Sequence, residues 1–177
     1  MTDSLQVAHP MRQSQREIIE VGELEQVLAN SQVCHLAINK ANEAPYLVAL
    51  NYGFDFDARE RSLVLWFHCA DQGLKLDLLR AEPLVGFQLE SRVELDQGSG
   101  TQACDWGMKY ESIVGEGRVE IIEQREQRLH GLNCLMRHYG GSGLPFIEQA
   151  LDRTVVLRLD AHNFTGKRSS QLWPQIG

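Results

Sequence analysis

The sequence predicts a mainly β protein in which helices pack outside a small antiparallel barrel. Short segments rich in β-branched and aromatic residues recur along the chain and are separated by polar turns, as is typical of strands. Segments with helical periodicity are few, and they do not alternate regularly with the strands as they do in a parallel α/β sheet. Together these observations favour an antiparallel sheet with flanking helices.

The first helix is predicted over residues 15–30, where apolar residues recur at three- and four-residue spacing and form one face. Ser14 and Glu17 are three residues apart and match the pattern of a capping box. Because 177 residues is close to the length of one domain, roughly 150 residues, we interpret residues 14–177 as a single domain. Residues 1–13 are interpreted as an N-terminal arm.

The remaining elements follow from changes in periodicity. Three strands, close enough in sequence to form a meander, are predicted at residues 33–38, 45–52 and 62–68. Residues 55–61 are interpreted as a polar turn, with Asp55 and Asp57 solvated. The later elements are a helix at 73–81, a strand at 84–90, a loop at 95–106, a strand at 110–120, a helix at 123–139, a short helix near 145–150 and a strand at 154–159.

Composition and charge exclude several classes of protein. The chain has 24 acidic and 17 basic residues, so its net charge of −7 argues against binding nucleic acid or an anionic membrane by bulk charge. No apolar stretch approaches the roughly 20 residues that a membrane span needs, and the N-terminus lacks the pattern of a signal peptide. The four cysteines are scattered, which favours reduced thiols and a cytoplasmic location.

The turn after the third strand is the most informative segment. Gly73 permits a tight turn, and Lys75 lies in the first turn of the predicted helix. Free backbone N–H groups at a helix start attract anions, whereas a lysine there is unfavourable for the helix dipole unless an anion is bound. The segment therefore suggests a phosphate site. The alternative is an ordinary turn with a solvated lysine.

Histidine and cysteine pairs raise the question of a metal site. His68 and Cys69 are adjacent on a strand and point to opposite faces, so they cannot share one ion. His130, Cys134 and His138 share one face of the second long helix, but one ion can hold only an adjacent pair of them. Because the sequence indicates no further ligands, we predict no metal site and interpret Cys134 as a buried thiol.

Two polar residues, Asn51 and Tyr52, close the second strand after an apolar stretch. They either face a ligand or lie at the solvated end of the sheet.

The order and spacing of several segments resemble the flavin-binding split-barrel proteins related to pyridoxamine 5′-phosphate oxidase, and most closely their nitroimidazole-resistance branch. The segments that carry the resemblance are residues 16–18, 35–37, 45–53, 67–75, 110–118 and 165–167. The chain departs from the family pattern at Ala49, where proline is frequent, and at Cys69, where serine or threonine is frequent and supplies a phosphate-contacting hydroxyl.

The resemblance implies a six-stranded antiparallel split β-barrel of Greek-key topology that forms a homodimer, with FMN in each of two clefts between the subunits. It implies an apolar wall for the flavin ring, polar partners for the ring edge, a phosphate site and a functional histidine. The implied site residues are Val48, Leu50 and Trp66 for the wall; Asn51, Tyr52 and the partner subunit's Ser112 for the edge; Cys69, Ala70, Gly73 and Lys75 near the phosphate; His68 as the catalytic residue; and Lys167 as an added positive charge.

The resemblance also implies an activity. We expect an FMN-dependent oxidoreductase that passes electrons from a nicotinamide nucleotide to a small acceptor, such as a nitro-aromatic compound or a quinone. One alternative is a haem-binding or haem-degrading split-barrel protein, for which His162 is one candidate ligand. The other alternative is a non-catalytic module that binds a flavin, because a fold does not fix a function.

Overall fold

The computed structural model describes residues 11–169, so most of the predicted N-terminal arm lies outside the described residues. In chain order, its helices and strands are β1 (Glu17–Ile18), α1 (Val21–Asn30), β2 (Cys34–Ile38), β3 (Tyr46–Leu50), β4 (Gly53–Asp57), β5 (Ser62–Ala70), α2 (Leu74–Ala81), β6 (Leu84–Asp96), β7 (Gly107–Ile122), α3 (Arg125–His138), α4 (Glu148–Asp152) and β8 (Thr154–Arg168). Short 3-10 turns lie at Ser14–Arg16 and Ala103–Asp105. None of the helices in residues 11–169 is both long and apolar enough to cross a membrane.

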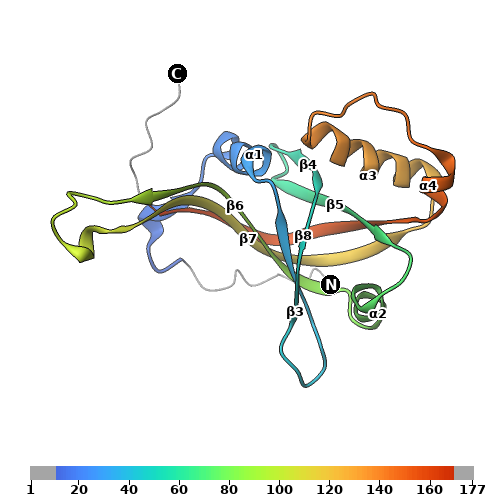
Figure 1. Ribbon diagram of the computed structural model, residues 1–177, viewed down its shortest axis with the longest axis horizontal. Coiled ribbons are helices and arrows are strands. Elements are labelled where there is room, and N and C mark those ends of the chain that lie inside the picture. Colours follow the sequence, from blue (N-terminus) through green and yellow to red (C-terminus); the bar gives the residue numbers. More distant parts are fainter. Residues whose placement is uncertain (1–10, 170–177) are drawn as a thin grey trace.

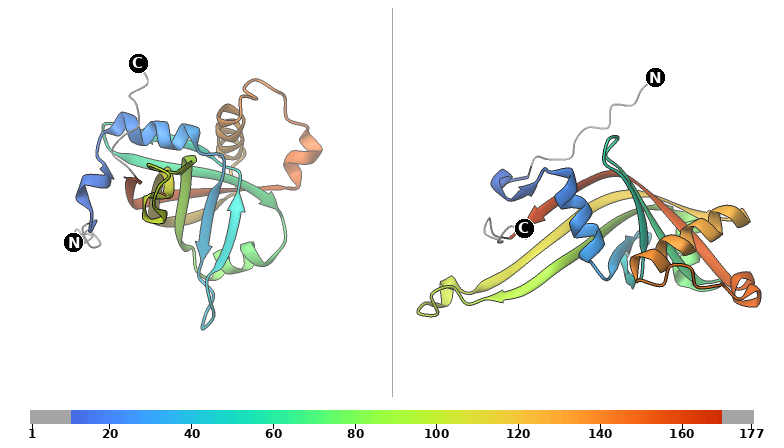
Figure 2. Two further views of the ribbon diagram at one scale, coloured as in Figure 1. Left: turned by 60° about the vertical axis from the view of Figure 1, so that its left-hand side comes forward. Right: turned by 90° about the horizontal axis from the view of Figure 1, so that it is seen from above.

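The strands form one strongly bent antiparallel sheet, in the order β3-β2-β6-β7-β8-β5-β4. The long strands β6, β7 and β8 run side by side through the molecule, and the β6–β7 hairpin projects beyond it (Figures 1 and 2). The class predicted from the sequence, an antiparallel sheet with flanking helices, is confirmed. The predicted count of six strands is wrong, because eight strands form, and the sheet does not close between β3 and β4.

The two additional strands are the places where local sequence was misleading. The chain at Glu17–Ile18 does not begin a helix but pairs with β8, where Ile18 lies opposite Gly166. The helix therefore begins at Val21, and the predicted capping box does not form. Residues 53–57 form β4 against β5 rather than part of a polar turn. The predicted loop at 95–106 also begins too early, since β6 extends to Asp96.

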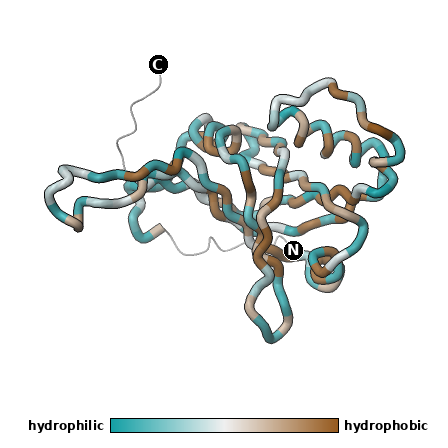
Figure 3. The backbone as a smooth tube through the Cα atoms, viewed as in Figure 1, coloured by the Kyte–Doolittle hydropathy of each residue, from teal (hydrophilic) through white to brown (hydrophobic). Residues whose placement is uncertain are grey.

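Side chains alternate across the sheet and build two apolar clusters. The larger cluster fills the concave interior, which α1 covers, and it includes Leu36, Phe67 and Leu159. The smaller cluster lies beneath α3 on the outer face of β5 and β8 and includes Trp66 and Val156. Figure 3 shows the apolar stretches gathered along the strands at the centre of the molecule, away from the β6–β7 hairpin tip. The bend of the sheet thus gives it an interior and an outer face, of which α3 covers only one part.

Candidate functional site

The turn between β5 and α2 has the geometry that the sequence predicts. Gly73 has a φ of +127°, a conformation that residues with a side chain rarely adopt, and its carbonyl accepts hydrogen bonds from Leu76 and Asp77. No side chain of the described residues caps the N-terminus of α2. Its first backbone N–H groups therefore remain for water or an anion.

Lys75 brings positive charge to the end of β5. Burial lowers the pKa of His68, and the charge of Lys75 lowers it further, so the imidazole is held neutral. Burial raises the pKa of Cys69, whereas Lys75 and Arg80 oppose that shift. The structure therefore brings together three of the predicted site residues, His68, Cys69 and Lys75, beside an uncapped helix start.

The side chain of His68 lines a small apolar hollow. The hollow has a volume of about 190 Å³ and lies between the end of β5 and the helices α3 and α4. Its walls include Leu132, Met136, Phe146 and Ile147. A neutral imidazole in this position has one donor and one acceptor nitrogen available to a bound molecule.

Two predicted site residues are covered by the protein's own chain. Trp66 is 5% exposed beneath α3, where its indole lies against Gly131 and its Nε1 donates to Asp55 Oδ2 at 2.8 Å. Tyr52 has no exposed surface, and its hydroxyl donates to the Leu28 carbonyl at 2.5 Å. The expectation that these two side chains face a ligand is therefore corrected, because α3 covers one and the barrel interior encloses the other.

The other predicted residues of β3 and β5 remain accessible. Val48 and Leu50 are half-buried and pack from β3 against the interior cluster. Asn51 is exposed directly after β3, and Ala70 is exposed at the end of β5. These four residues can contact a ligand without a change of fold.

Ser112 and Lys167 lie together but far from the β5–α2 turn. They are directly paired across β7 and β8 near the end of β8. Ala70 pairs with Thr154 at the opposite end of that strand. Lys167 is thirteen residue steps from Thr154 along β8, which corresponds to about 40 Å of strand at about 3.3 Å per residue. One chain therefore cannot bring Lys167 to the β5–α2 turn. The contribution of the partner subunit's Ser112 stays a prediction.

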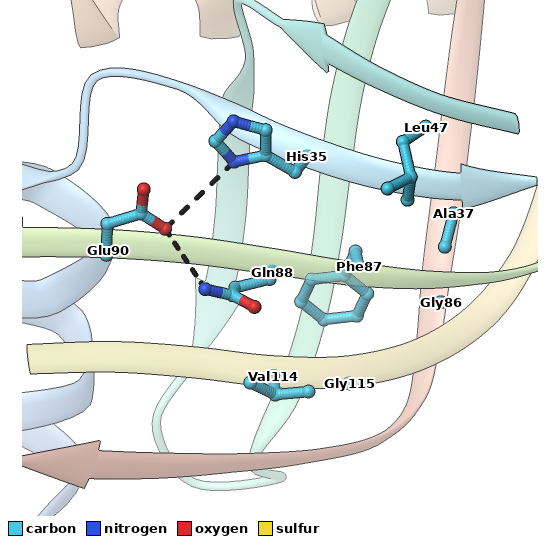
Figure 4. A pocket seen from close by; sticks show the side chains of 9 residues that line it. All are labelled: His35, Ala37, Leu47, Gly86, Phe87, Gln88, Glu90, Val114 and Gly115. Atoms are coloured by element: carbon cyan, nitrogen blue, oxygen red, sulfur yellow. Dashed lines mark hydrogen bonds and ion pairs between the residues drawn. The ribbon is translucent and has the colours of Figure 1, made fainter.

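A larger hollow, which we did not predict from the sequence, lies on the uncovered outer face of β2, β3, β6 and β7. It has a volume of about 450 Å³, within the range of ligand sites, and is shown in Figure 4. Its lining residues are His35, Ala37, Leu47, Gly86, Phe87, Gln88, Glu90, Val114 and Gly115. Among the described residues of the lining, Glu90 supplies the carboxylate, which accepts a hydrogen bond from Gln88 Nε2 at 3.3 Å and lies 4.0 Å from His35 Nδ1.

The apolar character of this face is unusual for a surface open to solvent. Among the described residues, Leu47 is 70% exposed and Val114 is 49% exposed. The sequence contained one signal, since the outward positions Ala37, Leu47 and Ala49 are apolar where a solvated strand has polar residues. An exposed apolar face of this kind marks a site of contact with a ligand or another protein surface.

A polar cluster lies beneath α3 on the covered part of the sheet. Asp55 accepts hydrogen bonds from Trp66 and Arg137 and lies beside His130 and Cys134. Burial alone would raise the pKa of Asp55, but the hydrogen bonds from His130 and Trp66 outweigh it and lower the pKa. Burial, together with the charge of Asp55, raises the pKa of Cys134 to about 11.

The sequence profile of one protein family, pyridoxamine 5′-phosphate oxidase, matches residues 20–168, which is most of the chain. The chain belongs to this family. The resemblance inferred from the sequence is thereby confirmed. No curated protein matches the chain.

Solved structures resemble the chain over most of its length. A candidate 5-nitroimidazole antibiotic resistance protein from Bacteroides thetaiotaomicron is 26% identical, with a TM-score of 0.72 over 86% of each chain. An FAD-binding protein from Mesorhizobium loti is 26% identical, with a TM-score of 0.60 over 88% of this chain and 98% of the other. An FAD- and haem-binding protein from Mycobacterium smegmatis is 16% identical, with a TM-score of 0.73 over 92% and 77%, and shows the shared fold alone.

Proposed function

We propose that this protein is a flavin-dependent oxidoreductase that holds FMN and passes electrons from a nicotinamide nucleotide to a small acceptor. The observation that carries the proposal is the β5–α2 turn, where an uncapped helix start, Gly73 and Lys75 form a setting for a phosphate. Family membership and the FAD-binding relative from Mesorhizobium loti support the proposal that this phosphate belongs to a flavin nucleotide.

The residues at the turn fit a phosphate dianion. The left-handed backbone at Gly73 lets the chain approach a ligand closely, and the first N–H groups of α2 are available as donors. Lys75 supplies a positive charge, and the side chain of Arg80 is close enough to act on Cys69. Cys69 replaces the hydroxyl that is frequent in the family, so backbone donors and Lys75 carry more of the binding here.

The ring of the flavin needs an apolar surface of larger area. We place it in a cleft between two copies of the chain, bounded by Val48 and Leu50 and by the uncovered outer face of the second copy. Such a cleft explains why Ser112 and Lys75 lie at opposite ends of the sheet within one subunit. One subunit then supplies Lys75 to the cleft, and its partner supplies Ser112. The homodimer is part of this proposal.

FMN would supply the hydride and electron transfer when bound, while the protein binds, orients and excludes water. His68 is neutral and lies at the mouth of an apolar hollow, so its imidazole can hold a proton next to the acceptor. Leu132 and Phe146 in the same hollow exclude water from that position. No side chain needs to form a covalent bond with the substrate.

The first experiment is an absorption spectrum of the purified protein, before and after addition of FMN and desalting. We expect a flavin spectrum that survives desalting, bleaches when a nicotinamide nucleotide is added without oxygen, and returns when an acceptor is added. Mass spectrometry of the released cofactor is expected to identify FMN. Released FAD would overturn the choice of FMN, a Soret band would favour haem, and a retained flavin that no nicotinamide nucleotide reduces would leave a non-catalytic binding module.

The phosphate assignment has its own test. Replacing Lys75 with alanine should lower the FMN retained after desalting by about tenfold or more, because a charge-assisted contact to phosphate is lost. Lys40→Ala is the matched control, since Lys40 pairs with Glu43 on the exposed β2–β3 turn. Equal flavin retention in the two variants would contradict the assignment of Lys75.

A further inference from the structure

Three side chains from two distant parts of the sequence converge under α3. His130 and Cys134 are four residues apart on α3, and Asp55 projects toward them from β4. His130 Nε2 lies 2.6 Å from Asp55 Oδ2 and 3.4 Å from Cys134 Sγ. Cys134 Sγ lies 3.5 Å from Asp55 Oδ1 and 3.6 Å from Oδ2. One nitrogen, one sulfur and one carboxylate oxygen therefore surround a common point.

The arrangement differs from a catalytic relay of cysteine, histidine and aspartate. A relay needs the histidine to contact the aspartate through one ring nitrogen and the nucleophile through the other. Here the same nitrogen, Nε2 of His130, faces both Asp55 and Cys134. The convergence of three donor atoms on one point is instead the arrangement found around a metal ion.

We propose that Asp55, His130 and Cys134 form a binding site for a divalent transition-metal ion of the zinc type. Bonds of about 2.0–2.3 Å to such an ion separate tetrahedral ligands by about 3.3–3.6 Å. The distances from Cys134 Sγ to Asp55 Oδ2, 3.6 Å, and to His130 Nε2, 3.4 Å, already lie in this range. Only the distance between His130 and Asp55 must widen, and the His130 side chain is 52% exposed, so a change of its rotamer does not disturb the core.

The groups around the three ligands orient them for this role. Trp66 Nε1 donates to Asp55 Oδ2 at 2.8 Å and fixes the carboxylate, as outer hydrogen bonds do in metal sites. Arg137 Nη2 lies 3.1 Å from Asp55 Oδ1 and 3.3 Å from Cys134 Sγ. Its positive charge opposes an ion, but the side chain is 59% exposed and can turn into solvent. Arg137 thus occupies the site in competition with the ion.

The fourth position of a tetrahedral ion would be open. A hollow of about 390 Å³ adjoins the cluster and is lined by Phe54, Phe56 and Arg137 among others. His138 also lines it, but its Nε2 lies 2.9 Å from the Ser31 carbonyl, which holds the ring away from the cluster. Water or a small anionic ligand therefore completes the coordination, as in zinc sites with three protein ligands.

The experiment is a titration of the full-length protein, with its bound cofactor, with Co²⁺. We expect saturable ligand-field bands of tetrahedral Co²⁺ at wavelengths longer than flavin absorption, and their loss when Zn²⁺ is added. His130→Gln and Cys134→Ser should abolish the bands, whereas Cys104→Ser, at an exposed cysteine outside the cluster, should leave them unchanged. His130 is exposed, so His130→Gln tests the site without disturbing the core.

A second variant gives a result that a nonspecific site would not. Arg137→Ala should tighten Co²⁺ binding by about tenfold, because a competing positive charge is removed. Tetrahedral bands that persist in both His130→Gln and Cys134→Ser, or only the weak spectrum of octahedral Co²⁺ in the unmodified protein, would overturn the proposal. Flavin retention by His130→Gln should equal that of the unmodified protein, which separates this proposal from the proposed function.

Discussion

The outer surface of the sheet has two apolar regions, one buried beneath α3 and the other exposed to solvent. Over β5 and β8, α3 covers Trp66 and Val156 and completes a small core. On the outer face of β2, β3, β6 and β7, the side chains of Leu47 and Val114 are exposed to solvent in the described part of the chain. An exposed apolar face of this kind is typical of a contact surface, and the proposed dimer places a second copy of the chain over the second region.

Polar groups sharpen the contrast between the two regions. The covered region contains charged groups, but Trp66, His130 and Arg137 all contact the carboxylate of Asp55. In the uncovered region the polar side chains His35, Gln88 and Glu90 lie together, and the rest of the hollow is apolar side chains and glycine backbone. The first region is therefore adapted to the protein's own helix, and in the proposed dimer the second region contacts the flavin ring and the other copy of the chain.

The largest expected effect comes from placing a methyl group in each region. A Cβ at Gly53 would lie 2.3 Å from the backbone of Cys134, so Gly53→Ala forces α3 off the sheet. We expect a loss of about 3 kcal/mol in the free energy of unfolding. A Cβ at Gly86, on the uncovered face, meets its nearest neighbour, Ala37, at an ordinary 3.7 Å.

Urea denaturation of the two variants checks this prediction. Gly86→Ala should unfold within about 0.5 kcal/mol of the unmodified protein. Equal destabilisation by the two substitutions would mean that the two faces are packed alike, and the comparison would fail.

The next effect concerns self-association. If a second copy covers the outer face of β2 and β3, Leu47→Asp should convert a dimer into a monomer, because it buries a charge in the interface. The thermal midpoint of the separated monomer should change little, since Leu47 is exposed in the single chain. Sedimentation velocity gives the mass, and Ile19→Asp, at another exposed apolar position, is the control. A dimer that persists in Leu47→Asp would place the interface elsewhere.

The smallest effect is a pH dependence at the end of β5. Burial, and then the charge of Lys75, lowers the pKa of His68 in the folded state below its unfolded value of about 6.5. As the pH falls below about 6.5, the unfolded chain binds this proton first, so the folded state loses stability. Above that pH the group is neutral in both states and has no effect.

Urea denaturation between about pH 8 and about pH 5 measures this dependence. His68→Gln should match the unmodified protein at the upper end and lose less stability at the lower end. Some dependence should remain, because burial also lowers the pKa of His138. Identical slopes for the two proteins would show that His68 is not held neutral by the fold.

The sequence determined the elements whose signal is local. Alternation of large apolar residues predicted β5, and helical spacing predicted the long helix α3 to within two residues. The glycine after β5 indicated the tight turn, because the conformation of a tight turn depends on the residues within it. These features need no information about distant parts of the chain.

Only the tertiary structure decided the features that depend on distant pairing. Ile18 has the spacing of a helical residue but is buried against β8, since a strand edge nearly 150 residues away accepts it. The segment around Asp55 has the composition of a polar turn. It nevertheless forms β4, because it pairs with β5 and because His130 of α3 contacts the Asp55 carboxylate. Which part of the outer face is covered was likewise set by where α3 docks, and the apolar outward positions of β2 and β3 do not specify where that helix lies. Burial and strand pairing are properties of the folded chain, whereas the periodicity of a segment indicates only which secondary structure that segment favours.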